Sequence, residues 1–200
     1  MKLVAVSQRI DTVSNRLEVR DSVDQRLNEF LIEAGYITVP VPNAISTHVV
    51  DQKILDCWID RISFDGLVLT GGDDIGVYNI RDELEMKLIE HCFKNEIPVL
   101  GICRGLQVLA AWAGVGSVRV FGHVGERHEL YGIIEGSVNS FHNFSIAQCP
   151  PNFNVIARAL DEEIEAIKHC QLPWEGWMWH PEREQVFDSR DLRRLKELFN

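Results

Sequence analysis

The first half of the chain alternates short apolar runs with longer stretches of helical periodicity, and this alternation limits the possible folds more than any other feature. The apolar runs predict buried strands at Lys2–Val6, Tyr36–Val41, Leu67–Thr70 and Pro98–Ile102. Apolar side chains at helical spacing predict helices at Asn15–Ala34, Thr47–Trp58, Arg81–Asn95 and Leu106–Ala113. Buried strands joined by helices indicate βαβ units, and therefore a parallel sheet in an α/β fold.

The second half of the chain has a different pattern. Residues 117–179 are strand-like and irregular, and Asp188–Asn200 predicts a C-terminal helix. No internal repeat, low-complexity tract or linker divides the chain, and its 200 residues have the length of one ordinary domain. We therefore expect a single domain over residues 1–200, in which the second half adds a small antiparallel β portion to the parallel sheet.

Charge and composition argue against several classes of function. A net charge of −10 disfavours nucleic-acid binding, which needs a basic surface. No apolar stretch approaches the roughly 20 residues of a membrane helix, and the apolar run at the N-terminus is too short for a secretory signal, so we expect a cytoplasmic protein. The five cysteines lack zinc-site spacing, and no dinucleotide or phosphate-loop fingerprint occurs, so we expect neither a metal nor a cofactor.

Cys103 lies between a predicted buried strand and a predicted helix, with Gly101 and Gly105 two residues away on either side. Small neighbours permit the tight turn of a nucleophile elbow, which presents its side chain at the carboxyl edge of the sheet. A helix N-terminus also favours thiolate over thiol. The pattern indicates a nucleophilic cysteine; the alternative is a core cysteine with glycine neighbours.

His180 and Glu182 are candidates for the groups that activate such a cysteine. They lie two residues apart, and an extended backbone would place both side chains on one face. His180 would then act as the general base for Cys103, and Glu182 would orient the imidazole ring. The alternative is a surface loop with a solvated carboxylate.

The predicted strand at Leu67–Thr70 runs directly into Gly71 and Gly72. Two glycines at the carboxyl edge of a parallel sheet expose backbone N–H groups. The N–H groups of Gly72 and Arg104 would together form an oxyanion hole. The alternative is a flexible turn.

Three motifs occur in a fixed order along the chain: Gly71-Gly-Asp-Asp-Ile-Gly76, Gly101-Ile-Cys-Arg-Gly-Leu-Gln107 and Trp179-His-Pro-Glu-Arg-Glu184. With them, nearly the whole chain resembles the class I glutamine amidotransferase-like superfamily, in the branch of the γ-glutamyl hydrolases of peptidase family C26. The resemblance implies a flavodoxin-like sandwich with helices on both faces of a mostly parallel sheet. It also implies that Cys103, His180 and Glu182 cleave a γ-glutamyl amide through a thioester on Cys103.

The same resemblance implies a pocket for the glutamyl group. An α-amino acid needs donors for its carboxylate and acceptors for its ammonium group, so polar residues suit this role. The expected substrate-binding residues are Gly71, Gln107, His123, Ser140, His142 and Asn143. For Ser140–Asn143 the alternative is a polar β-turn.

The identity of the leaving group stays open at this stage. Residues 117–137 leave room for only a compact insert, so leaving-group recognition is expected to differ from that of γ-glutamyl-GABA hydrolases. In size and overall similarity the chain resembles hydrolases that release cytidine diphosphoramidate in bacterial capsule synthesis. The alternatives are a scavenging γ-glutamyl hydrolase, a glutaminase subunit with a synthetase partner, and a binding or redox-sensing protein without turnover. A small-molecule substrate and a homo-oligomer or synthetase partner are compatible with these alternatives.

Some residues keep two interpretations. Arg81 and Glu85 lie one helical step apart and are expected to pair. Three arginines either clamp an anionic leaving group or are solvated: Arg9, Arg20 and Arg26. Three tryptophans either wall the site or, as we favour, pack on the sheet: Trp174, Trp177 and Trp179.

Overall fold

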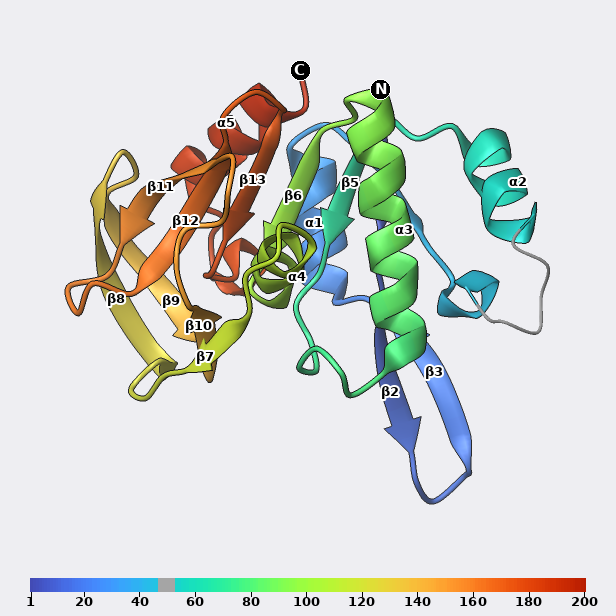
Figure 1. Cartoon of the computed structure of the whole chain (residues 1–200), viewed down its shortest axis with the longest axis horizontal. Helices are drawn as coiled ribbons and strands as arrows, with labels where there is room; N and C mark the ends of the chain where they lie inside the picture. The colour runs from blue at the N-terminus through green and yellow to red at the C-terminus, as the bar shows by residue number, and fades with distance from the viewer. Residues whose placement is uncertain (47–52) are drawn as a thin grey trace.

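A nine-stranded sheet runs through the computed structural model, which describes residues 1–46 and 53–200 (Figure 1). Its strand order is β4-β1-β5-β6-β13-β12-β11-β8-β9. The first five strands in this order are parallel: β4 (Ile37–Pro40), β1 (Leu3–Val6), β5 (Gly66–Leu69), β6 (Val99–Ile102) and β13 (Trp174–Trp177). Leu69 pairs with Gly101, and Ile102 pairs with Trp177. The segments that follow β5, β6 and β13 therefore leave the sheet at one edge.

The other strands of this sheet are antiparallel, and all come from the second half of the chain. They are β12 (Ile164–His169), β11 (Phe153–Arg158), β8 (Val124–Gly132) and β9 (Gly136–Phe141). A separate two-stranded sheet pairs β7 (Ser117–Arg119) with β10 (Phe144–Ile146). The antiparallel portion thus extends the parallel sheet directly.

Helices cover both faces of the sheet. On the front face in Figure 1, α3 (Asn79–Asn95) contacts α4 (Arg104–Trp112). Behind the sheet lie α1 (Gln25–Glu33) and α5 (Ser189–Leu198). The other described helical segments are α2 (Lys53–Ile62) and the 3-10 turns η1 (Asn43–Ser46) and η2 (Pro181–Arg183). The predicted α/β fold is confirmed, and in residues 1–46 and 53–200 no helix is long and apolar enough to cross a membrane.

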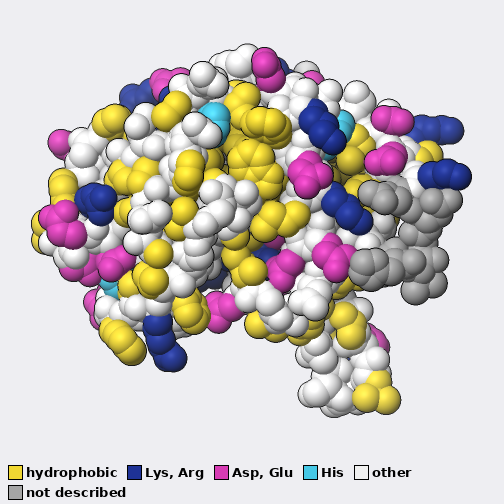
Figure 2. Space-filling model, in the orientation of Figure 1, with side chains coloured by type: hydrophobic (Ala, Val, Ile, Leu, Met, Phe, Trp, Pro, Cys, Tyr) yellow, Lys and Arg dark blue, Asp and Glu magenta, His cyan; other side chains and the backbone are white. Residues whose placement is uncertain are grey.

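The prediction of one helix over Asn15–Ala34 is wrong in its first part. A hairpin of β2 (Arg9–Val13) and β3 (Glu18–Ser22) occupies that region and projects from the body of the molecule (Figures 1 and 2). β-branched residues favour these strands over a helix. The helix itself begins later, because the Asp24 carboxylate caps it by accepting a hydrogen bond from Arg26 N.

The helix predicted at Thr47–Trp58 falls partly outside the described residues, which omit 47–52. In the described part, α2 spans Lys53–Ile62 and so extends beyond the predicted end. Leu55 and Ile59, one helical turn apart, are its buried side chains.

The tryptophans pack inside the protein, as favoured from the sequence. Trp174, Trp177 and Trp179 are each at most 1% exposed, and the rings of Trp177 and Trp179 stack at 5.4 Å. The indole N–H of Trp179 donates a hydrogen bond to Asp191. The stacked rings of Trp177 and Trp179 therefore pack on the α5 side of the sheet, whereas Trp174 contacts Phe93 of α3 and Trp112 of α4 on the other side. None of the three stands free to stack on a ligand.

The turn from β6 into α4 is packed without room for side chains at its glycines. A Cβ atom on Gly101 would lie 2.5 Å from the backbone of Gly105, and one on Gly105 would lie 2.1 Å from the Leu69 carbonyl oxygen. Real Cβ atoms do not approach backbone atoms so closely. The two glycines therefore allow the start of α4 to rest directly on the end of β5.

We expect Gly105→Ala to lower the free energy of unfolding by about 1–3 kcal/mol, because overpacking must push α4 away from β5. Urea denaturation measures this change. Gly116→Ala is the matched control, because a Cβ there meets nothing within 4 Å. Equal stability of the two variants would contradict the close packing at the turn.

Candidate active site

Cys103 occupies the turn between β6 and α4 in a backbone conformation that few residues adopt. Its φ of 51° and ψ of −103° lie outside the ordinary regions for a side-chain-bearing residue. The amide of Cys103 donates to the carbonyl of Trp177 at 2.7 Å, which holds the turn against β13. The residue is 7% exposed, and it lines the cavity described below. This strained turn matches the elbow expected from the flanking glycines.

His180 and Glu182 form a buried pair at the carboxyl end of β13. The imidazole Nδ1 and the Glu182 Oε1 are 2.6 Å apart, and the residues are 2% and 5% exposed. Asn139 of β9 anchors the backbone of His180, accepting from its amide at 3.0 Å and donating to its carbonyl at 2.7 Å. The position of the imidazole ring is therefore fixed by Glu182 on one side and by Asn139 of β9 on the other.

The pKa of His180 is raised to about 9. Burial opposes the charged ring and lowers the pKa, but the Glu182 carboxylate and the hydrogen bond with the Cys103 thiol outweigh burial. The thiol, the imidazole and the carboxylate are thus connected in that order. This arrangement can move a proton between sulfur and imidazole while the carboxylate stabilises the imidazolium.

The turn of Gly71 and Gly72, which follows β5, lies against the imidazole ring of His180. A Cβ on Gly71 would lie 2.6 Å from His180 Cε1, so no other residue fits beside the imidazole. Gly72 has a φ of 138°, and a Cβ there would lie 2.5 Å from Arg81 Nη1. Gly72, Cys103 and His180 line one cavity of about 270 Å³.

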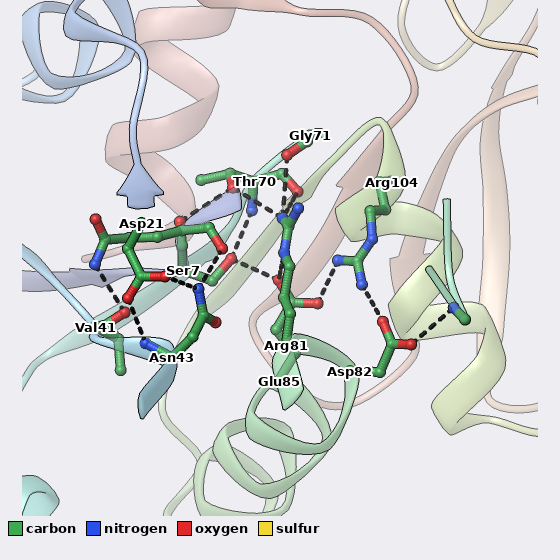
Figure 3. A network of polar contacts seen from close by, with 12 residues as sticks. Ser7, Asp21, Val41, Asn43, Thr70, Gly71, Arg81, Asp82, Glu85 and Arg104 are labelled. Carbon is green, nitrogen blue, oxygen red and sulfur yellow. Dashed lines mark hydrogen bonds and ion pairs between the residues drawn. The ribbon is translucent and has the colours of Figure 1, made fainter. Parts of the chain in front are cut away.

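A buried charge cluster holds this turn in place (Figure 3). Arg81 donates to Glu85 at 2.9 Å and to the carbonyl of Gly71 at 3.0 Å. Arg104, the residue after the cysteine, pairs with both Glu85 and Asp82. Burial raises the pKa of the Glu85 carboxyl, but the two arginines outweigh burial and hold it below its usual value. The expected pairing of Arg81 with Glu85 is confirmed, and Arg104 joins it from another helix.

Three residues around the cavity were not expected from the sequence: Asp11, Phe141 and Arg183. The lining is completed by Arg9 and Asp73. The Arg183 guanidinium lies 4.6 Å from the centroid of the Phe141 ring. The missed signal for Arg183 was its place inside the motif Trp179–Glu184, one residue after the carboxylate.

The three arginines that had two interpretations have different surroundings in the structure. Arg9 lines the cavity beside Cys103. Arg20 is half exposed and pairs with Glu18 on the hairpin. Arg26 donates to the backbone carbonyl of Glu184 at 2.6 Å, so it ties α1 to the segment after η2. Of these three, only Arg9 is therefore placed to meet a ligand at Cys103.

Most of the side chains expected in the glutamyl pocket make contacts elsewhere. Gln107 donates to the Phe144 carbonyl at 2.9 Å, and Ser140 donates to the His123 carbonyl at 2.7 Å. Asn143 is exposed. The rings of His123 and His142 face a buried carboxylate, Glu165. Among the described residues, the cavity at Cys103 is lined by none of these expected residues: Gln107, His123, Ser140, His142 and Asn143.

Comparison with known proteins defines the class of this protein. The family model described as "Glutamine amidotransferase class-I" matches residues 16–191. The chain is 37% identical over 141 residues to the γ-glutamyl-CDP-amidate hydrolase of Campylobacter jejuni subsp. jejuni serotype O:2, covering 67% of this chain and 69% of that protein. It is 35% identical over 147 residues to a glutamine-hydrolyzing GMP synthase subunit of Methanothrix thermoacetophila, covering 66% and 77%.

A solved structure shows the same fold. It is described as a GMP synthase subunit of Thermoplasma acidophilum, with a TM-score of 0.74 and 23% identity, covering 100% of this chain and 94% of that one. The chain belongs to the class I glutamine amidotransferase family and is a hydrolase of that type. The predicted family is therefore confirmed, and the alternative of a binding or redox-sensing protein loses its support.

We expect His180 to titrate near pH 9 and to titrate at lower pH in Glu182→Gln, because the carboxylate stabilises the imidazolium. Since the folded pKa exceeds the unfolded value of about 6.5, the pair stabilises the fold fully below that pH, and the stabilisation disappears as the pH rises through about 9. NMR titration of the ring nitrogens measures the pKa. Glu197→Gln, at an exposed position of α5, is the control. An unchanged His180 titration in Glu182→Gln would exclude this role of Glu182.

Proposed function

We propose that this protein hydrolyses a γ-glutamyl amide with Cys103 as nucleophile, His180 as general base and acid, and Glu182 as the residue that orients the imidazole. The observation that carries the proposal is the hydrogen-bonded series from Cys103 through His180 to Glu182, which begins at a strained turn in a cavity. Hydrolysis of an amide by a thiol needs no metal or cofactor at this site.

The chemistry follows from these positions. His180 takes the thiol proton before the attack, since its raised pKa favours the imidazolium, and the Cys103 sulfur attacks the γ-carbonyl as a thiolate. The backbone N–H groups of Gly72 and Arg104 stabilise the resulting oxyanion. His180 then protonates the leaving nitrogen as the C–N bond breaks, which leaves a glutamyl thioester. Water, deprotonated by His180, attacks the thioester, and the thiol and glutamate are released.

We infer that the leaving group is anionic, and specifically that γ-glutamyl-CDP-amidate is cleaved to glutamate and cytidine diphosphoramidate in capsule polysaccharide modification. The name of the Campylobacter relative supports this substrate. Arg9 and Arg183 flank the cavity at Cys103, and guanidinium groups suit a diphosphate. A second cavity of about 560 Å³ shares Phe141 and Arg183 with the first and offers room for a nucleoside. In this proposal the protein is cytoplasmic and belongs to the C26 branch.

The cavity also contains carboxylates, which give Arg9 and Arg183 different surroundings. Asp11 pairs with Arg9 at 3.2 Å, and Asp73 lines the same cavity. In contrast, Arg183 has no ion pair among residues 1–46 and 53–200, and its guanidinium lies over the Phe141 ring. Arg183 is therefore the cation best placed to receive a phosphate.

The second candidate function is a glutaminase subunit that supplies ammonia to a separate synthetase. Its support is the set of relatives that are glutamine-hydrolyzing GMP synthase subunits. Such a protein would use the same nucleophile but take free glutamine. The two candidates therefore differ in substrate and in the need for a partner protein.

Glutamate release by the purified protein separates these candidates. The substrates are glutamine, γ-glutamyl-GABA, a γ-glutamyl anilide and γ-glutamyl-CDP-amidate, each with Cys103→Ala as the inactive control. We expect kcat/KM to be highest for the nucleotide conjugate, and Cys103→Ala to lose at least about 10³-fold. Preference for γ-glutamyl-GABA would indicate a scavenging hydrolase. No turnover without a partner would favour the glutaminase candidate, and full activity of Cys103→Ala would exclude the thiol mechanism.

We expect Arg183→Ala to raise KM for the nucleotide conjugate about tenfold or more, since a charge-assisted hydrogen bond contributes about 1.5–3 kcal/mol. KM for the anilide should change little, because that leaving group carries no phosphate. Steady-state kinetics on both substrates measure the difference. Arg20→Ala is the control, because this arginine lies on the hairpin and pairs with Glu18. Equal effects of Arg183→Ala on both substrates would exclude a phosphate contact.

A further inference from the structure

Three histidines and one glutamate meet inside the antiparallel half of the sheet, apart from the cavity at Cys103. Glu165 belongs to β12 and His128 to β8, whereas His123 precedes β8 and His142 follows β9. One ligand atom from each lies within 4.8 Å of the others. Glu165 is fully buried, and His123 and His142 are 2% and 3% exposed. Such a group inside a protein requires a physical explanation, because buried charge must be compensated.

Four of the six distances between these atoms are close to the edges of a tetrahedron around a small metal ion. Glu165 Oε1 lies 3.1 Å from His128 Nδ1, 3.4 Å from His142 Nε2 and 3.6 Å from His123 Nδ1. His123 Nδ1 and His142 Nε2 are 3.3 Å apart. Four ligands bonded to zinc at about 2.0–2.1 Å are separated by about 3.3 Å in tetrahedral geometry. The four separations above scatter around that value, and the remaining two, from His128 to the other histidines, are at most 4.8 Å.

Outer contacts orient two of the rings toward the centre of the group. The His123 Nε2 lies 2.8 Å from Asp161 Oδ2, and the His142 Nδ1 lies 3.1 Å from the Phe144 carbonyl. A carbonyl oxygen only accepts hydrogen bonds, so the proton of neutral His142 resides on Nδ1 and its Nε2 carries the lone pair. The same holds for His123, whose Nδ1 carries the lone pair because Nε2 donates to Asp161. Carboxylate and carbonyl partners of this kind are the usual outer support of histidine ligands to metals.

In these tautomers the nitrogens of His123 and His142 that face the centre are both acceptors, and among the four groups only His128 Nδ1, 3.1 Å from Glu165 Oε1, is left as a donor. The lone pairs of His123 and His142 face each other and face the Glu165 carboxylate. The second oxygen of that carboxylate, Oε2, is buried and has no hydrogen-bond partner in the described part of the chain. A cation between the four groups would remove this repulsion.

We propose that His123, His128, His142 and Glu165 bind one divalent transition-metal ion of the zinc class. Three imidazole nitrogens and one carboxylate oxygen suit zinc, and four protein ligands make a closed structural site. The metal would connect β12 to β8 and to the residues that directly precede and follow the hairpin of β8 and β9. Asn139, which anchors the His180 backbone, also belongs to β9. The ion would therefore stabilise the strand that positions His180.

Metal binding to the untagged full-length chain tests this proposal. Cys103→Ser serves as the background, so that the thiol in the active-site cavity cannot hold the metal. After removal of metal with a chelator, the protein is dialysed against micromolar zinc, and bound metal is measured by mass spectrometry. We expect about one zinc per chain and a rise in Tm of about 5 °C or more in saturating zinc. Cobalt(II) at the site should show the strong visible absorption of a tetrahedral complex.

Substitutions of the proposed ligands test where the metal binds. His128→Ala and Glu165→Gln should each weaken zinc binding at least about tenfold, because each removes one ligand. His91→Ala is the control, since this histidine lies on α3 and contacts Asn95. Circular dichroism verifies folding, and His128→Ala keeps the test valid if Glu165→Gln does not fold, because His128 is at the edge of the cluster. Absence of bound zinc in the folded protein, or unchanged binding in the folded variants, would overturn the proposal in favour of a purely imidazolium–carboxylate cluster.

Discussion

The buried ion cluster of Arg81, Glu85 and Arg104 is the interaction on which the active-site side of the molecule depends. It joins α3 to α4, and through Arg81 it holds the carbonyl of Gly71. Ser7, at the end of β1, donates to the same Glu85 carboxylate at 2.8 Å. One carboxylate therefore connects the ends of three structural segments. Removing one partner of such a cluster leaves an unpaired buried charge, which typically costs about 3–5 kcal/mol.

Close backbone packing supplies the second constraint. The cluster sets the position of the Gly71–Gly72 turn, and Gly105 lets α4 rest on β5 directly behind it. Cys103 lies between these two contacts and accepts an uncommon backbone conformation as a result. The strain at the cysteine is thus maintained by its surroundings. Charge pairing and glycine packing together explain why a thiol, an imidazole and two backbone turns meet at one edge of the sheet.

The two halves of the sheet serve the site in different ways. The parallel half provides the turns that end at Cys103 and Gly72. The antiparallel half provides Asn139, which anchors His180, and Phe141, which lines the cavity. The His–Glu cluster lies in that second half, where β8, β9 and β12 meet. The antiparallel half therefore holds His180 through the backbone hydrogen bonds of Asn139 and through the Phe141 ring, which contacts the imidazole.

Local patterns in the sequence were sufficient for the parallel half of the fold and for the principal candidate residues. Short apolar runs identify strands because both faces of a parallel sheet are buried, and the glycines around Cys103 mark a turn that tolerates no side chains. The sequence also predicted the pairing of His180 with Glu182, but the expected extended backbone is wrong, because the 3-10 turn over Pro181–Arg183 brings the two side chains together. The hairpin at Arg9–Ser22 escaped detection, because apolar residues at mixed spacing fit a helix as well as two strands.

Only the tertiary structure decided which distant groups meet. The placement of Arg9 and Arg183 at the cavity, the link from Glu85 to Arg104, and the gathering of His123, His128, His142 and Glu165 all depend on how separate elements pack. Side-chain spacing along a chain reports on contacts within one helix or strand. Contacts between elements depend on sheet order and register, which one sequence does not display. The sequence by itself determined the chemistry available at the elbow, and the packed sheet decided which charges surround it.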